Sequence, residues 1–226
     1  MEPDPPNAST VLEETCGTTT FVCEYEGGIM MGADTRTTLG PYVSNRESDK
    51  ITKIADNIYC CRSGSSADTQ AICNLATYHM DLDVADGLRE MQDPPLVYRA
   101  ASLFRDIFRE NEGNIKAAMI IAGWDRVKGS QVYALPSNGV LVRQNCALGG
   151  SGSSYILGYV DKEWRSNMKR EDCMEFMKTA LSLAMARDYA SGGLINIGVM
   201  ETEKPMEKHI FTQQELLRYC NYQRTL

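Results

Sequence analysis

The chain has 226 residues, of which 43% are hydrophobic and 23% charged, a composition that suits one large globular domain or two small ones. Its net charge of -7 disfavours binding to the phosphate backbone of nucleic acids or to an anionic membrane surface, and no apolar run approaches the ~20 residues that span a bilayer. Eight cysteines without a C-x-x-C pair indicate reduced core thiols, with neither a metal centre nor a disulfide framework.

Residues 1–17 are acidic and rich in proline, and no hydrophobic periodicity runs through them. They lack the basic start and the apolar centre of a secretory signal peptide. We therefore expect a flexible tail that ends at Gly17-Thr18, immediately before a strand-like run.

Two strand hairpins are predicted after this tail. Residues 19–34 form the first, with its turn at Gly27-Gly28, and residues 48–64 form the second, with its turn near Asp56-Asn57. Two helices follow, one from Ser65 or Ser66 and one from Pro94-Pro95. The apolar stripe expected along the first helix, at i, i+4 spacing, consists of Ala67, Ala71, Leu75 and His79 and is flanked by Ile72 and Ala76.

The second half repeats the order of strands before helices. Strands are predicted over 117–125, 130–136 and 139–148, then a glycine-rich loop at 149–154 with a short helix, a long helix over 170–190, and strands over 193–200 and 208–212. Such separate blocks favour an α+β fold over alternating βαβ units. We expect two antiparallel sheets packed face to face, each covered by a helix pair.

The chemistry available to the chain is narrow. Neither of the two histidines lies beside a serine or cysteine nucleophile motif, and residues 149–154 lack a phosphate-binding lysine, which disfavours a histidine-dependent hydrolase and a nucleotide site. A threonine exposed at a new N-terminus would carry its own base, because a free α-amine has a pKa of about 7.7–8.0. Cleavage after Gly17 would create this group at Thr18. From these residues alone, a loop that enters a strand remains the simpler interpretation.

Several ordered segments resemble those of proteasome β-type subunits. They include "GTTTFVCEYEGGIMMGADTRTT", "SDKI", "IYCCRSGSSADTQ", "ALGGSGSSYILGYVD" and "LAMARDYASGG", and the resemblance covers about four-fifths of the chain, from Gly17 to about Val199. Within the family the chain is most similar to the beta-1, or caspase-like, type. The segment after Glu201 matches poorly.

The resemblance implies an N-terminal-nucleophile hydrolase, a four-layer α-β-β-α sandwich in which residues 1–17 are a propeptide removed by autocleavage and residues 18–226 are the catalytic domain. It implies that Thr18 is the nucleophile, that Lys50 and Asp34 assist it, and that Gly64 supplies the N–H of the oxyanion hole. The residues that would surround and orient the Thr18 amine are Ser151, Asp188 and Ser191.

The resemblance also implies a substrate site. Arg62 would line the pocket for the residue before the scissile bond and favour Asp or Glu there. Other substrate-channel positions are Thr37, Thr38, Thr52 and Ser66, of which Thr38 and Ser66 would offer backbone groups to an extended peptide. The family commonly has alanine where this chain has Ser66, and Thr35 and Ser48 also differ conservatively from its usual residues.

The function implied is a threonine endopeptidase of the 20S proteasome core that cleaves after acidic residues in ATP- and ubiquitin-dependent protein degradation, in the cytoplasm and nucleus. It needs no metal or cofactor. Its partners would be the other α and β subunits of a twenty-eight-subunit barrel of stacked seven-membered rings, and its substrates unfolded polypeptides. Two alternatives are a non-catalytic ring subunit and a homo-oligomeric threonine protease of the bacterial type.

Overall fold

The computed structural model of the chain describes residues 17–39, 42–85, 93–212 and 215. Most of the expected propeptide, residues 1–16, and residues 213–214 and 216–226 near the C-terminus lie outside the described residues. Within them, no helix is both long enough and apolar enough to cross a membrane.

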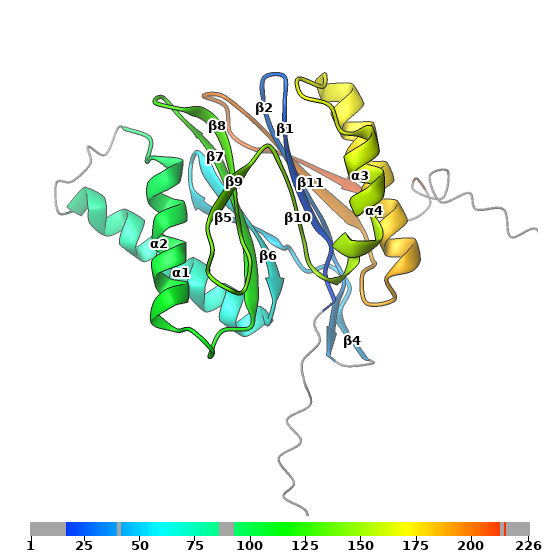
Figure 1. Cartoon of the computed structure of the whole chain (residues 1–226), viewed down its shortest axis with the longest axis horizontal. Helices are drawn as coiled ribbons and strands as arrows, with labels where there is room; N and C mark the ends of the chain where they lie inside the picture. Colours follow the sequence, from blue (N-terminus) through cyan, green and yellow to red (C-terminus); the bar gives the residue numbers. More distant parts are fainter. Residues whose placement is uncertain (1–16, 40–41, 86–92, 213–214, 216–226) are drawn as a thin grey trace, which may run out of the picture.

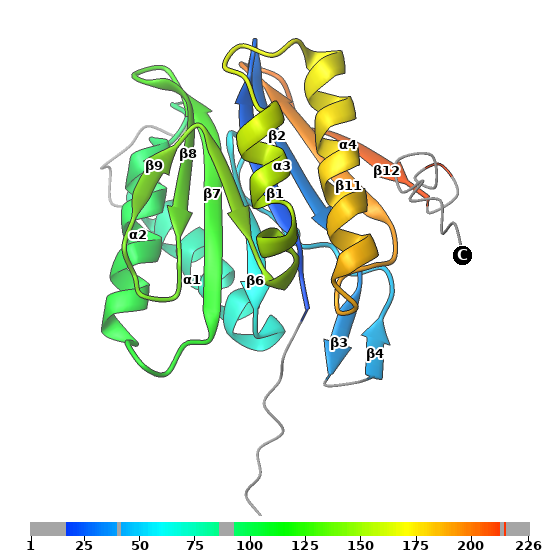
Figure 2. The same cartoon turned by 45° about the vertical axis from the view of Figure 1, so that its right-hand side comes forward.

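Two five-stranded antiparallel sheets face each other, and a helix pair covers the outer face of each (Figures 1 and 2). The first sheet contains, in spatial order, β10 (Cys146–Gly149), β1 (Thr20–Tyr25), β2 (Gly28–Asp34), β11 (Ile195–Glu201) and β12 (Glu207–Phe211). The second contains β5 (Ile51–Ala55), β6 (Ile58–Gly64), β7 (Ala117–Asp125), β8 (Gly129–Leu135) and β9 (Val142–Gln144). The predicted four-layer arrangement is confirmed.

Helices α1 (Ser66–Ala85) and α2 (Val97–Glu110) lie on the second sheet, and α3 (Leu157–Glu163) and α4 (Arg170–Arg187) lie on the first (Figure 2). A short 3₁₀ helix, η1 (Ser151–Tyr155), leads into α3. A separate ribbon of β3 (Thr37–Leu39) and β4 (Tyr42–Asn45) extends below the two sheets in Figure 2, and the sequence analysis did not predict it.

Three apolar layers hold this sandwich together. Between the sheets, Val22 and Met31 of the first meet Ile120 and Val132 of the second. The outer face of the first sheet packs on α4, where the Phe21 ring meets the Phe176 ring edge to face at 5.3 Å. The outer face of the second sheet packs on α1 and α2. Because both faces of the central strands are covered, β1 and β2 are buried along almost their whole length.

Two sequence predictions are wrong in ways that reflect this layering. The segment 139–148 is not one strand: β9 pairs with β8 in the second sheet, and β10 pairs with β1 in the first. The chain crosses between sheets at Asn145, whose carbonyl accepts a hydrogen bond from the Glu24 N–H at 2.8 Å. The sequence of 139–148 does not show where the chain leaves one sheet for the other, because the residues of β9 and those of β10 are equally typical of a strand.

The predicted centre of the α1 stripe is also wrong, although Ile72 and Ala76, which were expected beside it, are buried. Ala67, Ala71 and Leu75 are exposed, whereas the buried side is formed by Thr69, Ile72, Cys73, Ala76 and Met80. The helix is weakly amphipathic, so the sequence offers two neighbouring stripes that could each face the sheet. Packing of α1 against β5 and β6 determines which of the two is buried. The long helix ends at Arg187, three residues before the predicted end, where Asp188 adopts an extended conformation.

Candidate active site at the start of the first strand

Thr18 lies two residues before β1, buried between the ends of the two sheets with only 3% of its surface exposed. Its N–H donates to the Ser151 Oγ at 3.2 Å, and its carbonyl accepts from the Gly152 N–H at 3.2 Å. The glycine-rich loop therefore fixes the Thr18 backbone on both sides. The Thr18 hydroxyl donates to the Gly17 carbonyl at 2.7 Å, across the peptide bond whose cleavage the sequence analysis predicts.

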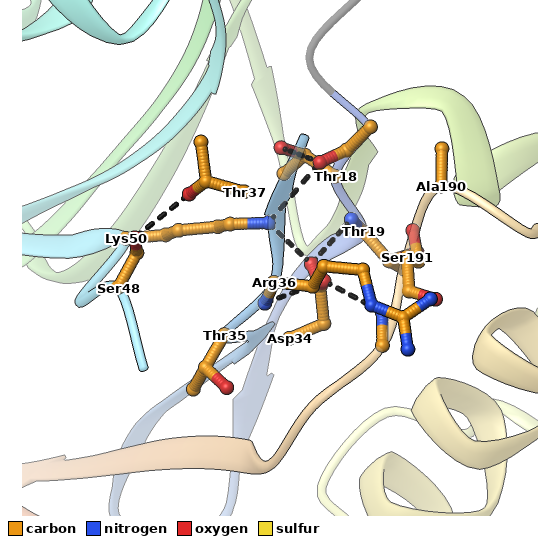
Figure 3. Close-up of polar contacts among 12 residues, drawn as sticks. Thr18, Thr19, Asp34, Thr35, Arg36, Thr37, Ser48, Lys50, Ala190 and Ser191 are labelled. Atoms are coloured by element: carbon orange, nitrogen blue, oxygen red, sulfur yellow. Dashed lines mark hydrogen bonds and ion pairs between the residues drawn. The ribbon is translucent and has the colours of Figure 1, made fainter. Parts of the chain in front are cut away.

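Lys50, the residue directly before β5, reaches the same carbonyl. Its Nζ lies 3.3 Å from the Gly17 oxygen and 2.7 Å from the Asp34 Oδ1, with the side chain extended across the site (Figure 3). Asp34 is the last residue of β2 and fully buried, and its carboxylate also accepts the N–H groups of Thr19, Arg36 and Gly192. A buried carboxylate with four donors is well stabilised and holds the lysine in one position.

A second carboxylate lies on the other side of Thr18. Asp188, the residue after α4, accepts hydrogen bonds from the Ser151 hydroxyl at 2.7 Å and the Ser191 hydroxyl at 2.6 Å. Burial alone would raise the pKa of Asp188, but these hydroxyls, with the Ala190 N–H and the positive charge of Lys50, outweigh it and lower the pKa below 3.8. Asp188 is therefore an anion that orients Ser151 toward the Thr18 nitrogen.

Gly64 has a positive φ of 105° at the end of β6, and an added Cβ would lie 2.3 Å from the Lys116 carbonyl oxygen. Only glycine suits this position. Gly64 borders a small recess of about 30 Å³ together with Thr18, Lys50 and Arg62. This recess adjoins an open groove of about 670 Å³ next to the β3–β4 ribbon, and the two share Thr37, Ser48, Asp49, Arg62 and Ser66.

Arg62 is half-buried where recess and groove meet. Its Nη2 donates to the Asp49 carbonyl at 2.7 Å, and its buried Nε has no partner among the described residues. The guanidinium therefore presents a positive charge to the groove, and the hydrogen bond that it forms among the described residues is with a neutral carbonyl.

Of the other predicted substrate positions, three line the groove and one does not. Thr37 and Thr38 belong to β3 on one wall of the groove, and Ser66 is the first residue of α1 on the other. The Thr38 hydroxyl accepts the Gly17 N–H at 3.1 Å, so Thr38 already holds the residue before the predicted cleavage point. Thr52 lies in β5 opposite Cys60 and lines neither recess nor groove.

Two residues at the site were missed by the sequence analysis. Thr19 shares a hydrogen bond of 2.8 Å with Ser191, joining the two carboxylate clusters. Arg36 donates through Nη1 to the carbonyls of Tyr189 and Ser191, so it closes the loop that follows α4 (Figure 3). The signal for Arg36 was its i, i+2 spacing from Asp34, which puts both side chains on one face of an extended chain.

The groups gathered here can act on an acyl carbon. A hydroxyl and a cation meet at one carbonyl, and two carboxylates fix the groups around it. Among the described residues, no group of three or more His, Cys, Asp or Glu is arranged to hold a metal ion. Another surface hollow, of about 1000 Å³ around Asn57, Pro95 and Trp124, shares no lining residue with the recess or the groove.

Comparison with known proteins identifies similar chains. A family model described as "Proteasome subunit" matches residues 15–200. "Proteasome subunit beta type-6" of Dictyostelium discoideum is 43% identical over 203 residues, which cover 90% of this chain and 92% of that protein. "Proteasome subunit beta type-1" of Saccharomyces cerevisiae is 40% identical with the same coverage, and "Proteasome subunit beta type-9" of Bos taurus is 41% identical, covering 90% of each. Relatives of three β types are therefore about equally similar to this chain.

Proposed function

The chain belongs to the proteasome β-subunit family, and from this membership and the geometry at Thr18 we propose that it is a catalytic subunit, a threonine endopeptidase of caspase-like specificity. As a family member it has the N-terminal-nucleophile hydrolase fold and assembles with other proteasome subunits. The observation that carries the proposal is the convergence of the Thr18 hydroxyl and the Lys50 ammonium on the Gly17 carbonyl.

The first reaction is removal of the propeptide, residues 1–17. The Thr18 Oγ attacks the Gly17 carbonyl carbon, and the charge that develops on the carbonyl oxygen is stabilised by Lys50 Nζ, which lies 3.3 Å away. The C–N bond then breaks, the Thr18 nitrogen takes up the proton of the hydroxyl and becomes a free amine, and an ester remains between Gly17 and the Thr18 side chain. Water hydrolyses this ester, which releases the propeptide as a carboxylic acid and restores the Thr18 hydroxyl.

Turnover of substrate uses that amine as the base. It accepts the proton of the Thr18 hydroxyl, directly or through water, while Lys50 favours the developing alkoxide. The hydroxyl oxygen attacks the substrate carbonyl, and the Gly64 N–H stabilises the oxyanion. The leaving amine takes the proton, and water then releases the acyl group from Thr18. Ser151, Asp188 and Ser191 hold the amine in position.

Specificity for acidic residues follows from Arg62. At ~4 Å and an effective dielectric constant of ~20, an ion pair is worth about 4 kcal/mol before desolvation, which is ample to select Glu over an apolar residue. Thr37, Thr38 and Ser66 line the groove that would hold the peptide on either side. The groove is open, as unfolded polypeptide substrates of varied sequence require.

The cellular setting is inferred from the family. The chain would occupy one position in a β ring of the twenty-eight-subunit barrel, act in ATP- and ubiquitin-dependent degradation, and work in the cytoplasm and nucleus. The reaction as derived uses only the side chains and backbone groups of the chain and water, with no metal or cofactor.

The proposal is tested in assembled particles that differ only in this chain. Thr18→Ala should abolish hydrolysis of a Glu-ending reporter peptide by this subunit, and Thr179→Ala, at a half-buried position of α4 outside the recess and the groove, should leave it unchanged. Arg62→Ala should remove the preference for the Glu-ending over a Leu-ending reporter. Full activity in Thr18→Ala would make this a non-catalytic ring subunit, and an unchanged preference in Arg62→Ala would refute the specificity.

A further inference from the structure

Asp49 contacts the specificity residue Arg62 through its backbone alone. The Arg62 Nη2 donates to the Asp49 carbonyl at 2.7 Å, and no carboxylate among the described residues forms an ion pair with this guanidinium. Yet the Asp49 carboxylate belongs to the very residue whose carbonyl touches Arg62. It is the anion that could most easily turn and neutralise Arg62.

The carboxylate is held elsewhere by three donors. Its Oδ1 accepts the Ile51 N–H at 2.9 Å and the Asn196 Nδ2 at 3.1 Å, and its Oδ2 accepts the Lys208 Nζ at 2.7 Å. Asn196 and Lys208 lie on β11 and β12, in the sheet opposite Arg62, so they hold the carboxylate toward the first sheet. Of the three donors, only Lys208 carries a charge that balances the carboxylate.

We propose that Lys208 is a specificity-determining positioning residue. It retains the Asp49 carboxylate on the side of β12 and thereby leaves the Arg62 guanidinium free for an acidic substrate side chain. This inference rests on the proposed function, since it takes Arg62 as the group that recognises the substrate. Lys208 does not touch the substrate itself, but acts through Asp49.

The ion pair is a surface contact, because the Lys208 and Asp49 side chains are 45% and 49% exposed. Such pairs contribute little to folding stability. A small bias is sufficient here, however, because Asp49 contacts two cations among the described residues, Lys208 through its carboxylate and Arg62 through its carbonyl. Loss of Lys208 leaves Arg62 as the cation that Asp49 still contacts, and a neutralised Arg62 no longer distinguishes Glu from its neutral analogue Gln.

The test compares Glu-ending and Gln-ending reporter peptides in assembled particles, with the rate of the Thr18→Ala particle subtracted as background. Lys208→Met keeps the apolar stem and removes the charge. It should lower the ratio of kcat/KM for Glu over Gln by about twofold to fivefold, the range of an exposed ion pair. The matched control is Lys204→Met. Lys204 is an exposed lysine of the same hairpin, but its ion pair is with Glu201 and not with Asp49.

A second variant separates this mechanism from a general disturbance of β12. In Lys208→Met/Asp49→Asn no carboxylate is left to pair with Arg62, so the ratio should return to that of the parent chain. Lys208→Arg, which keeps the charge, should also preserve it. An unchanged ratio in Lys208→Met, or a reduced ratio that Asp49→Asn fails to restore, would overturn the inference. Failure of Arg62→Ala to reduce the ratio would instead overturn the proposed specificity.

Discussion

Gly17 occupies a position without room for a side chain. An added Cβ would lie 2.0 Å from the Ala190 Cβ and 2.6 Å from the Ala190 carbonyl oxygen. At the same time its N–H is bound by Thr38 and its carbonyl by Thr18 and Lys50. The residue before the nucleophile is therefore held on every side, and its lack of a side chain lets the chain pass close to the loop after α4.

A substitution at Gly17 should slow removal of the propeptide. In Gly17→Ala the new methyl group displaces the carbonyl from the Thr18 hydroxyl, since real Cβ atoms do not approach other carbons to 2.0 Å. Intact-mass measurement of assembled particles should show chains that retain residues 1–17. Gly158→Ala, where no atom lies within 4 Å of an added Cβ, should be processed like the parent chain. Equal processing of both variants would contradict this account of Gly17.

The carboxylate of Asp188 gives the site a defined pH dependence. Its pKa is lower in the folded chain than its ordinary value of 3.8 because hydrogen bonds from Ser191 and Ser151 outweigh burial. A group with a lowered folded pKa stabilises the fold above its ordinary pKa, and this stabilisation is lost as the pH falls through the folded value. The hydroxyls therefore contribute at neutral pH and progressively less in acid.

Ser191→Ala should consequently lower the free energy of unfolding by about 1.5–3 kcal/mol near neutral pH, the usual contribution of a hydrogen bond to a charged group. The difference from the parent chain should shrink once the pH falls below 3.8, in urea titrations followed by circular dichroism. Ser44→Ala removes an exposed hydroxyl that binds a carbonyl, so its effect should not vary with pH. If Ser191→Ala lowers the free energy of unfolding equally near neutral pH and below pH 3.8, the hydrogen bond to Asp188 is not the cause of the loss.

At the scale of elements, β1 sets the position of the nucleophile. It lies between β10 and β2 in the first sheet, and its residues face the inter-sheet core on one side and α4 on the other. Thr18, two residues before this strand, is therefore anchored to a strand that is packed on both faces. Helix α4 contributes twice, since it covers β1 and its end carries Asp188.

Weakening the contact between α4 and the sheet should destabilise the whole fold. Leu181 is fully buried against the first sheet, so Leu181→Ala should lower the free energy of unfolding by about 2–5 kcal/mol in urea titrations. Leu183 lies on the same helix but is only partly buried, so Leu183→Ala should cost clearly less. Equal losses in the two variants would mean that α4 packs through a different face.

The sequence predicted the strand hairpins at 19–34 and 48–64 because their turns and alternation are local signals. It did not predict the crossing at Asn145 or the buried face of α1, since those depend on which sheet or strand lies opposite. At the site, too, local features were predicted from the sequence and long-range contacts were not. A glycine–threonine junction suggested an N-terminal nucleophile, but only the family resemblance selected Lys50, Asp34 and Asp188, which lie far from Thr18 in the sequence.

At the scale of the whole molecule, the sandwich brings the two halves of the site together. The first sheet supplies Thr18 and Asp34, the second supplies Gly64 and Arg62, and Lys50 lies in the connection that leads into the second (Figure 3). The groove opens next to the β3–β4 ribbon, which lies outside both sheets. Packing of the two sheets therefore determines both the nucleophile's surroundings and the path of a peptide toward it.

The most direct test of the central claim is the N-terminal sequence of this chain in the purified, assembled particle. If a free Thr18 amine is the base, the chain should begin at Thr18, and the Thr18→Ala chain should keep its propeptide. A chain that still carries residues 1–17 in a fully assembled particle would contradict the account, because Thr18 would then have no free amine with which to activate its hydroxyl.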